Sequence, residues 1–419
     1  MNSSQPVPLA ELDEVVNRVV NETPVIDMHT HLYSQEFGDI GLWGIDELVN
    51  YHYLIAEVFR FSPISYASFW SMGKTAQADL IWKTLFHENS PISEATRGIL
   101  TVLHGLGLDT RASNLNVFRE YFRQYTRATY TDKVLKLAKV QSVVMTNDPF
   151  DENERTVWMA SPERDPRFKA VLRLDPLLLK WKETYRDLLA WGYEVQRELD
   201  DGTLAAIRRF LEDWSKRMRP VYMAVSLPPD FHYPDDSPTG VLIERCILPV
   251  CREFGLPFSM MIGVRKLVNP DLKLAGDSLG IADVSVVERL CMRFPQNRFL
   301  VSMLARENQH ALCVAARKFR NLLPFGCWWF MNNPSIIEEI TRERFELLGT
   351  SFIPQHSDAR VLDQLLYKWP HSRAIIAKVM VEKYSDLIRA GWSLTEETVR
   401  RDVEKLFQGN FASWIADSH

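Results

Sequence analysis

Two histidines separated by a single residue are the side chains of this sequence best suited to hold a metal ion. Asp27, His29 and His31 alternate within the apolar run VIDMHTHL. Alternate residues of a β-strand share one face, so we expect all three side chains to point the same way. Two imidazoles placed like this can bind one divalent ion, although two ordinary histidines also occur at this spacing by chance.

A carboxylate and an arginine stand near the other end of the chain. Asp358 ends the run SFIPQHSD, and Arg360 follows two residues later. A carboxylate beside a metal can act as a ligand, as a general base, or as both. The alternative interpretation is that Asp358 caps the helix expected over VLDQLLYKW. Asp358 can reach His29 and His31 only if the first and last strands are neighbours.

The elements that would bring these residues together are short apolar runs separated by helical stretches. Most runs are nearly continuous in hydrophobic residues, which is typical of parallel strands covered on both faces. Eight such strands alternating with helices predict an α/β fold, a (β/α)8 TIM-like barrel with its chemistry at the carboxyl ends of the strands. The runs lie at 25–32, 142–148, 168–176, 221–229, 257–264, 298–305, 322–330 and 351–358.

The connection between the first two runs is much longer than one crossover helix requires. Its content is helical, with stretches at 45–60, 77–89, 117–128 and 131–140. We therefore expect one barrel spanning 1–419, with a helical insertion subdomain over 33–140 between strands 1 and 2. In barrels of this kind the variable parts lie on the rim that holds the active site.

Composition excludes several classes of protein. The chain has 419 residues, of which 46% are hydrophobic, and its net charge of −5 lacks the basic field that nucleic-acid binding needs. No apolar run approaches the ~20 residues of a membrane span. The five cysteines form no CxxC pair, and the N-terminal residues lack the pattern of a signal peptide. We expect a cytoplasmic enzyme that contacts neither nucleic acid nor membrane.

The predicted strands also indicate how many metal ions the site holds. The fourth run ends without a lysine that could bridge two ions, and the fifth and sixth runs contain no histidine. A binuclear site would therefore lack ligands. One ion with three protein ligands fits the sequence better.

Several segments resemble the uronate isomerase (glucuronate isomerase) family of the amidohydrolase superfamily, in a divergent bacterial branch. The resemblance covers nearly the whole chain, and its most specific segments are DMHTHL, YHYL, RLDP, FGCWWFMNN and SFIPQHSDAR. The chain departs from the better-known branch at SMMIG, where Met261 replaces the histidine of a QLHIG-like pattern. The resemblance implies a barrel of the amidohydrolase type.

The resemblance also implies the reaction and the cofactor. The family interconverts D-glucuronate with D-fructuronate, and D-galacturonate with D-tagaturonate, by a 1,2 proton transfer through a cis-enediol. One divalent ion would be held by His29, His31 and Asp358. We expect zinc, with manganese, iron and cobalt as alternatives, since imidazole and carboxylate suit all four. The expected partners are a hexuronate substrate and further copies of the same chain.

Four residues take roles in substrate chemistry on this resemblance. Tyr53 would hydrogen-bond the C1 carbonyl oxygen, with His52 beside it on the insertion helix. Arg360 would hold the C2 and C3 hydroxyls, and Asp358, with a metal-bound hydroxyl, would remove the C2 proton. From the residues alone, His52 and Tyr53 could equally belong to the packing face of a helix.

Other side chains at predicted strand ends could surround a sugar acid. Arg173 suits the clamping of an anionic substrate, but could instead form an ion pair with Asp175. Trp328 and Trp329 end the seventh run, where alternation would let only one face the barrel axis. His356 shares the face of Asp358 and could support the site or simply be buried.

Two other functions remain open at this point. The same scaffold could carry a metal-dependent hydrolase that uses a metal-bound hydroxide as its nucleophile. It could also be a barrel that binds a sugar acid without catalysis.

Overall fold

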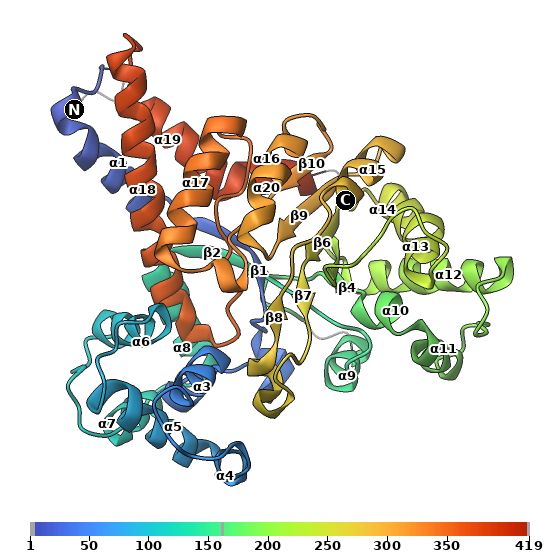
Figure 1. Ribbon diagram of the computed structural model, residues 1–419, viewed down its shortest axis with the longest axis horizontal. Helices are drawn as coiled ribbons and strands as arrows, with labels where there is room; N and C mark the ends of the chain where they lie inside the picture. Colours follow the sequence, from blue (N-terminus) through green and yellow to red (C-terminus); the bar gives the residue numbers. More distant parts are fainter. Residues whose placement is uncertain (1–4, 161–162, 417–419) are drawn as a thin grey trace.

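The computed structural model describes residues 5–160 and 163–416, and it forms a ring of parallel strands surrounded by helices (Figure 1). The first seven predicted runs each contain or overlap a strand, and the third run contains two short ones. This confirms the α/β barrel. The strands of the ring are β1 (Val25–Thr30), β2 (Val140–Met145), β3 (Phe168–Lys169), β4 (Leu172–Arg173), β5 (Met223–Leu227), β6 (Phe258–Ile262), β9 (Phe299–Met303) and β10 (Leu322–Pro324).

The strands pair in two parallel sheets that together make most of the ring. One sheet has the order β1-β2-β3, and the other has the order β10-β9-β6-β5-β4. A parallel bridge between Asn147 and Leu172 joins the two sheets. The backbone N–H of Arg173 donates to the carbonyl of Asn147 at 2.9 Å, which continues the contact toward the carboxyl ends.

The eighth position of the ring is an irregular segment, so the strand predicted at 351–358 is wrong. A single bridge joins Ile353 to Phe325 on one side. On the other side the backbone N–H of Asp358 donates to the carbonyl of His29 at 3.2 Å. Pro354 has no N–H to give and interrupts the ladder between these two points. The segment still closes the ring.

The helices form an outer layer around the strands (Figure 1). Among the described residues, no helix is both long enough and apolar enough to cross a membrane. The helices of this layer are α1 (Leu12–Glu22), α9 (Glu152–Ala160), α10 (Asp175–Leu179), α11 (Trp181–Ala190), α12 (Asp201–Met218), α13 (Pro238–Leu242), α14 (Leu248–Glu253), α15 (Ser285–Arg293), α16 (Gln309–Ala316), α17 (Pro334–Leu348), α18 (Leu365–Arg389), α19 (Glu396–Glu404) and α20 (Asn410–Ile415).

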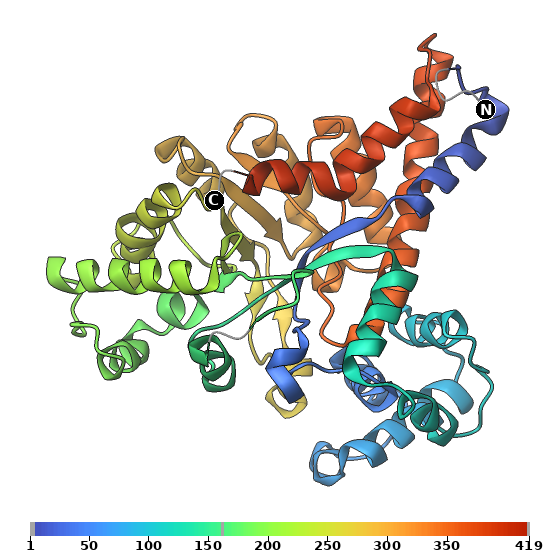
Figure 2. The same cartoon turned by 180° about the vertical axis from the view of Figure 1, so that it is seen from behind.

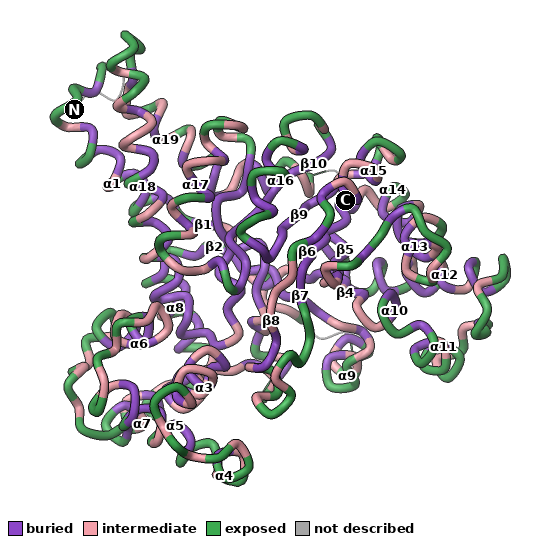
Figure 3. The backbone as a smooth tube through the Cα atoms, viewed as in Figure 1, coloured by how far each residue is buried: buried purple, intermediate pink, exposed green. Residues whose placement is uncertain are grey.

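Apolar side chains fill the ring and close one of its ends. Met28, Val144 and Leu300, from three different strands, belong to one buried cluster, and the burial of the strands is visible in Figure 3. Phe411 of α20 joins this cluster and lies 6.2 Å, ring to ring, from Tyr222, which directly precedes β5. Figure 2 shows α20 crossing the back of the ring. The amino ends of the strands are therefore covered, and the carboxyl ends remain for a site.

The long connection between β1 and β2 is helical, as predicted, and its helices gather at one end of the molecule (Figure 1). The continuous helix expected over 45–60 is wrong, because the backbone of Tyr51 is extended and separates α2 from α3. The division of the chain into a barrel and a subdomain over 33–140 stays a prediction. The helices are α2 (Ile45–Val49), α3 (His52–Val58), α4 (Tyr66–Ser71), α5 (Lys74–Trp82), α6 (Glu94–Gly105), α7 (Asn116–Phe122) and α8 (Arg127–Ala138).

A hairpin after β6 links the barrel rim to these helices. It is formed by β7 (Val264–Arg265) and β8 (Ser278–Leu279), which pair antiparallel. The segment between them reaches α4, where the indole N–H of Trp70 donates to the carbonyl of Asp271 at 2.8 Å. The hairpin thus spans from the rim of the ring to the helical connection.

The glycine at position 326 provides a test of the packing at the ring closure. Gly326 has a φ of +63°, and a Cβ there would overlap the imidazole Nδ1 of His356. Gly349 has a φ of +60° with no neighbouring atom within 4 Å of its Cβ position. We expect Gly349→Ala to lower the free energy of unfolding by about 1–3 kcal/mol, because an alanine is strained at this positive φ with a ψ of −122°. We expect Gly326→Ala to cost about 1–3 kcal/mol more, because of overpacking.

Urea unfolding of both variants measures this difference. Equal losses of unfolding free energy would show that the contact between position 326 and His356 is not tightly packed.

Candidate active site

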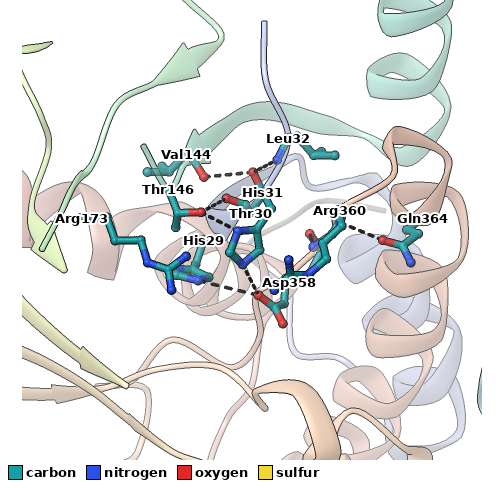
Figure 4. Close-up of polar contacts among 12 residues, drawn as sticks. His29, Thr30, His31, Leu32, Val144, Thr146, Arg173, Asp358, Arg360 and Gln364 are labelled. Carbon is teal, nitrogen blue, oxygen red and sulfur yellow. Dashed lines mark hydrogen bonds and ion pairs between the residues drawn. The ribbon is translucent and has the colours of Figure 1, made fainter. Parts of the chain in front are cut away.

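Three side chains that are far apart in the sequence converge at the carboxyl end of the ring (Figure 4). Nε2 of His31 lies 3.3 Å from Oδ1 of Asp358, and Nε2 of His29 lies 3.7 Å from the same oxygen. One ligand atom from each residue lies within 4.8 Å of the others. Two imidazole nitrogens and a carboxylate in this arrangement are a suitable donor set for a divalent ion.

The protonation states of these groups fit a cation. Burial lowers the pKa of His29 to about 3 and that of His31 to about 4, so both rings are neutral near pH 7. Burial also acts to raise the pKa of Asp358, but the surrounding polar groups, His31 first among them, hold it below its ordinary value. Oδ1 of Asp358 is buried and has no hydrogen-bond partner among the described residues. A charged oxygen left in this way is costly unless a cation meets it.

Asp27 does not belong to this group, contrary to the expectation that it shares a face with the histidines. Its carboxylate accepts hydrogen bonds from the backbone N–H of Ser357 at 3.0 Å and from the indole of Trp369, in α18, at 2.8 Å. The pairing of β1 with β2 is irregular between Asp27 and Thr30. This irregularity changes the phase of alternation, so the two histidines face the site while Asp27 packs against α18.

The surroundings of Asp358 exclude the interpretation that it is a helix cap. The backbone N–H groups of Arg360 and Val361 donate to the side-chain oxygen of Gln364 at 2.8 and 3.1 Å. Asp358 itself adopts a φ of 49°, a conformation that is uncommon for a residue with a side chain. Such strain is typical of functional positions.

A cavity that is open at its mouth borders the three converging residues. Four of the residues predicted to contact substrate line it, and Met261 lies in its wall. The four predicted residues are Arg173, Trp328, Trp329 and Arg360.

Both tryptophans line this cavity, so the expectation that only one would do so is wrong. Strand β10 ends at Pro324, before the tryptophans, and Trp329 has a φ of 47°. Strand alternation therefore does not apply to Trp328 and Trp329. The indole Nε1 of Trp329 is buried and has no hydrogen-bond partner among the described residues.

Both interpretations of Arg173, the ion pair with Asp175 and the contact with an anionic ligand, agree with its position. Its Nε and Nη2 donate to the carboxylate of Asp175 at 2.9 and 2.8 Å, and its side chain also lines the cavity. The ion pair uses two of the five N–H donors of a guanidinium. The remaining donors are sufficient to bind an anionic group of a ligand.

His52 and Tyr53 stand beside the cavity and are not among the residues that line it. The ring of His52 lies 5.7 Å from that of Trp329, and the ring of Tyr53 lies 4.6 Å from that of His52. Burial raises the pKa of Tyr53 and lowers that of His52, so the phenol keeps its proton and the imidazole is neutral. Neither the Tyr53 hydroxyl nor His52 Nε2 has a hydrogen-bond partner among the described residues.

His356 is fully buried and lies against the back of the site. Its ring is 5.3 Å from the ring of His29 and 5.3 Å from that of Phe325. Neither ring nitrogen has a hydrogen-bond partner among the described residues. His356 is not one of the three converging ligands.

Four residues near the site were not predicted. Thr146 and Tyr222 contact the two histidines. Lys266 lines the cavity, and the ammonium of Lys368 donates to the carbonyl of Ser357 at 2.5 Å. Thr146 and Tyr222 lie inside the runs predicted at 142–148 and 221–229, but only Thr146 stands toward the carboxyl end of its run, where a site is expected. Tyr222 comes from the opposite, amino end of its run, while Lys266 and Lys368 come from a hairpin and a helix whose paths the sequence does not reveal.

No family model matches the chain. A search of curated proteins also finds no match. Among solved structures, the chain is similar to a uronate isomerase from Bacillus halodurans C-125, with 56% identity, a TM-score of 0.96, and coverage of 98% of this chain and 97% of that one.

Two more distant structures share the fold. A uronate isomerase from Thermotoga maritima has 17% identity and a TM-score of 0.74, over 96% of this chain and 97% of that one. A glucuronate isomerase from Caulobacter crescentus has 12% identity and a TM-score of 0.76, over 99% of this chain and 96% of that one.

Metal binding by the three converging residues predicts that the folded protein is more stable with the ion than without it. A ligand present at 100 times its Kd stabilises the folded state by about 2.7 kcal/mol. We therefore expect zinc, added to chelator-treated protein, to raise the Tm of the wild type and not that of His31→Gln.

His310→Gln is the matched control, since His310 is exposed and pairs with Glu343 on the outer layer. Thermal scans with and without metal measure the increment. A full increment in His31→Gln would place the ion elsewhere.

Proposed function

Because the chain belongs to the uronate isomerase family, we propose that it interconverts D-glucuronate with D-fructuronate, and D-galacturonate with D-tagaturonate. The similarity to the Bacillus halodurans uronate isomerase over almost the full length of both chains is the observation that carries this proposal. The convergence of His29, His31 and Asp358 beside a cavity supports it.

The reaction moves a proton between C2 and C1 of an open-chain sugar acid, with no net oxidation. It needs a base that reaches C2, donors that stabilise the oxygens of the enediol, and groups that hold a carboxylate. The cavity has candidates for all three roles.

The three converging residues would hold one divalent ion, for which we propose zinc. When bound, this ion would anchor oxygens of the sugar acid and lower the pKa of a hydroxyl. The donor set fits this ion, since both rings are neutral and a carboxylate oxygen stands unpaired among the described residues.

We assign the removal of the C2 proton to Asp358. Its carboxylate is ionised at neutral pH, because its pKa lies below the ordinary value, and it borders the cavity. Positioning such a base typically contributes 10²–10⁴-fold to the rate. Sharing this carboxylate with the ion would restrict its rotation and aim it at the substrate.

Cationic side chains compensate for the charge of the substrate. Arg173, Lys266 and Arg360 all line the cavity of a chain whose overall charge is −5. Nε of Arg360 is buried and has no hydrogen-bond partner among the described residues. We propose that Arg360 holds the C2 and C3 hydroxyls and stabilises the charge of the enediolate.

Tyr53 is the proposed donor to the C1 carbonyl oxygen, with His52 positioning it. The hydroxyl of Tyr53 is protonated and without a partner among the described residues. Its place beside the cavity means that Tyr53 would reach the substrate past Trp329, whose ring lies 5.7 Å from that of His52. The two tryptophans would then form the apolar wall of the sugar pocket.

The compartment and the assembly state are also proposals. All five cysteines are buried and free, which suits a reducing cytoplasm. Exposed apolar side chains such as Trp392, 60% exposed, would suit contact with a second copy.

Turnover of D-glucuronate by the metal-loaded protein is the primary test, with exchange of the C2 hydrogen for solvent deuterium followed by NMR. We expect Asp358→Asn to lower kcat by about 10²–10⁴-fold, because the base is lost. Metal content is measured in the same samples, since Asp358 is also a proposed ligand.

Failure of every hexuronate with metal supplied would contradict the proposed reaction. Solvent oxygen-18 in the product would instead support the metal-dependent hydrolase, because isomerisation adds no water.

Arg173 provides a separate test of substrate binding. Arg173→Lys keeps the charge but removes the planar guanidinium, whose Nε and Nη2 hold Asp175 and whose remaining donors are left for the substrate. We expect KM for D-glucuronate to rise by about tenfold, with a smaller change in kcat, since one charge-assisted hydrogen bond is worth about 1.5–3 kcal/mol. Steady-state kinetics measure both constants.

Arg167→Lys is the control, because Arg167 forms a similar pair with Asp165 at a site outside the cavity lining. An unchanged KM in Arg173→Lys would remove Arg173 from substrate binding.

A further inference from the structure

Two hydroxyl groups that contact the proposed metal ligands donate their hydrogens to backbone carbonyls. We propose that Thr146 and Tyr222 are positioning residues that fix the tautomers of His31 and His29, so that each ring presents an unprotonated Nε2 to the ion. The inference deepens the proposed function and rests on the proposed metal centre.

The contact at His31 involves the end of the neighbouring strand. Oγ1 of Thr146 lies 2.8 Å from Nδ1 of His31 (Figure 4). The same hydroxyl donates to the carbonyl of Thr30 at 2.9 Å. A threonine hydroxyl has one hydrogen, and here that hydrogen is used by the carbonyl. With the hydrogen on the carbonyl, the Thr146 oxygen accepts from Nδ1 of His31, and Nδ1 carries the proton.

The contact at His29 repeats this arrangement from another part of the ring. The hydroxyl of Tyr222 donates to the carbonyl of Met28 at 2.7 Å, and its oxygen lies 3.2 Å from Nδ1 of His29. A phenol hydroxyl has one hydrogen, and the carbonyl of Met28 can only accept it. Nδ1 of His29 is then the donor to the phenolic oxygen.

The consequence lies on the opposite edge of each ring. A neutral imidazole that carries its proton on Nδ1 has a free lone pair on Nε2. The Nε2 atoms of His29 and His31 are the ones that lie 3.7 and 3.3 Å from Oδ1 of Asp358. Without a proton on either Nε2, neither histidine can donate a hydrogen bond to Oδ1 of Asp358. The three atoms present only lone pairs, and a cation can bind to all of them.

The arrangement also anchors each ligand to the strand beside it. Both acceptor carbonyls belong to β1, at Met28 and Thr30, while both hydroxyls come from other parts of the ring. Each histidine is thus contacted by a hydroxyl that donates to the carbonyl of the residue directly before that histidine. Loss of such a partner typically lowers metal affinity 10–100-fold.

Nitrogen-15 NMR of histidines in the metal-free protein tests the tautomers directly. His29→Gln and His31→Gln identify the signals. We expect both rings to have a protonated Nδ1 and an unprotonated Nε2 in the wild type. Tyr222→Phe should abolish this preference at His29 alone, and Thr146→Val should abolish it at His31 alone, while Thr146→Ser restores it.

Zinc affinity measured by calorimetry is the second readout. We expect Tyr222→Phe and Thr146→Val each to bind zinc 10–100-fold more weakly, and Thr146→Ser to bind close to wild type. Tyr384→Phe is the matched control, because it removes a buried tyrosine hydroxyl that donates to Asp402 at 3.0 Å, away from the site.

The two readouts separate this inference from the proposed function. Protonated Nε2 in the metal-free wild type, or unchanged zinc affinity in both variants, would overturn the positioning roles even in an active isomerase. The expected tautomers in a protein that turns over no hexuronate would leave the positioning roles standing and contradict the isomerase.

Discussion

The structure depends on the closure of the ring between its first strand and its last segment. The N–H of Asp358 donates to the carbonyl of His29 at 3.2 Å, and the N–H of His31 donates to the carbonyl of Ala359 at 2.7 Å. These two backbone hydrogen bonds join residues more than three hundred positions apart, and they place the carboxylate against both imidazoles. The site therefore exists only when the whole ring has formed, so metal binding and folding should be coupled.

Burial of charge is the second constraint. Asp358 is 4% exposed, and an ionised carboxylate at such a depth is costly without compensation. The ammonium of Lys368 is also buried. Burial lowers the pKa of Lys368 to about 8, although the carboxylates of Asp358 and Asp27 act to raise it. A cation bound by Asp358 would compensate the negative charge of this carboxylate on the side that faces the cavity. The basic side chains of the cavity then remain available for the substrate.

Departures from regular structure position several of the functional side chains. A break in the pairing of β1 directs His29 and His31 to the cavity, and left-handed backbone places Asp358 and Trp329. An extended residue before α3 begins the helix at His52. Each departure costs some stability and is maintained by the rigid ring around it. This agrees with a general expectation, since local rules of sequence are most often broken at functional sites.

The sequence by itself determined the strand and helix order of the barrel, because continuous apolar runs are sufficient to mark parallel strands. It also identified His29, His31 and Asp358, whose residue types suit a metal. Only the tertiary structure decided that Asp27 packs against α18, that both tryptophans line the cavity, and that Tyr222 and Thr146 hold the histidines. These outcomes depend on the phase of an irregular strand and on contacts between distant segments. Local periodicity carries no information about either, since both arise only when the ring closes.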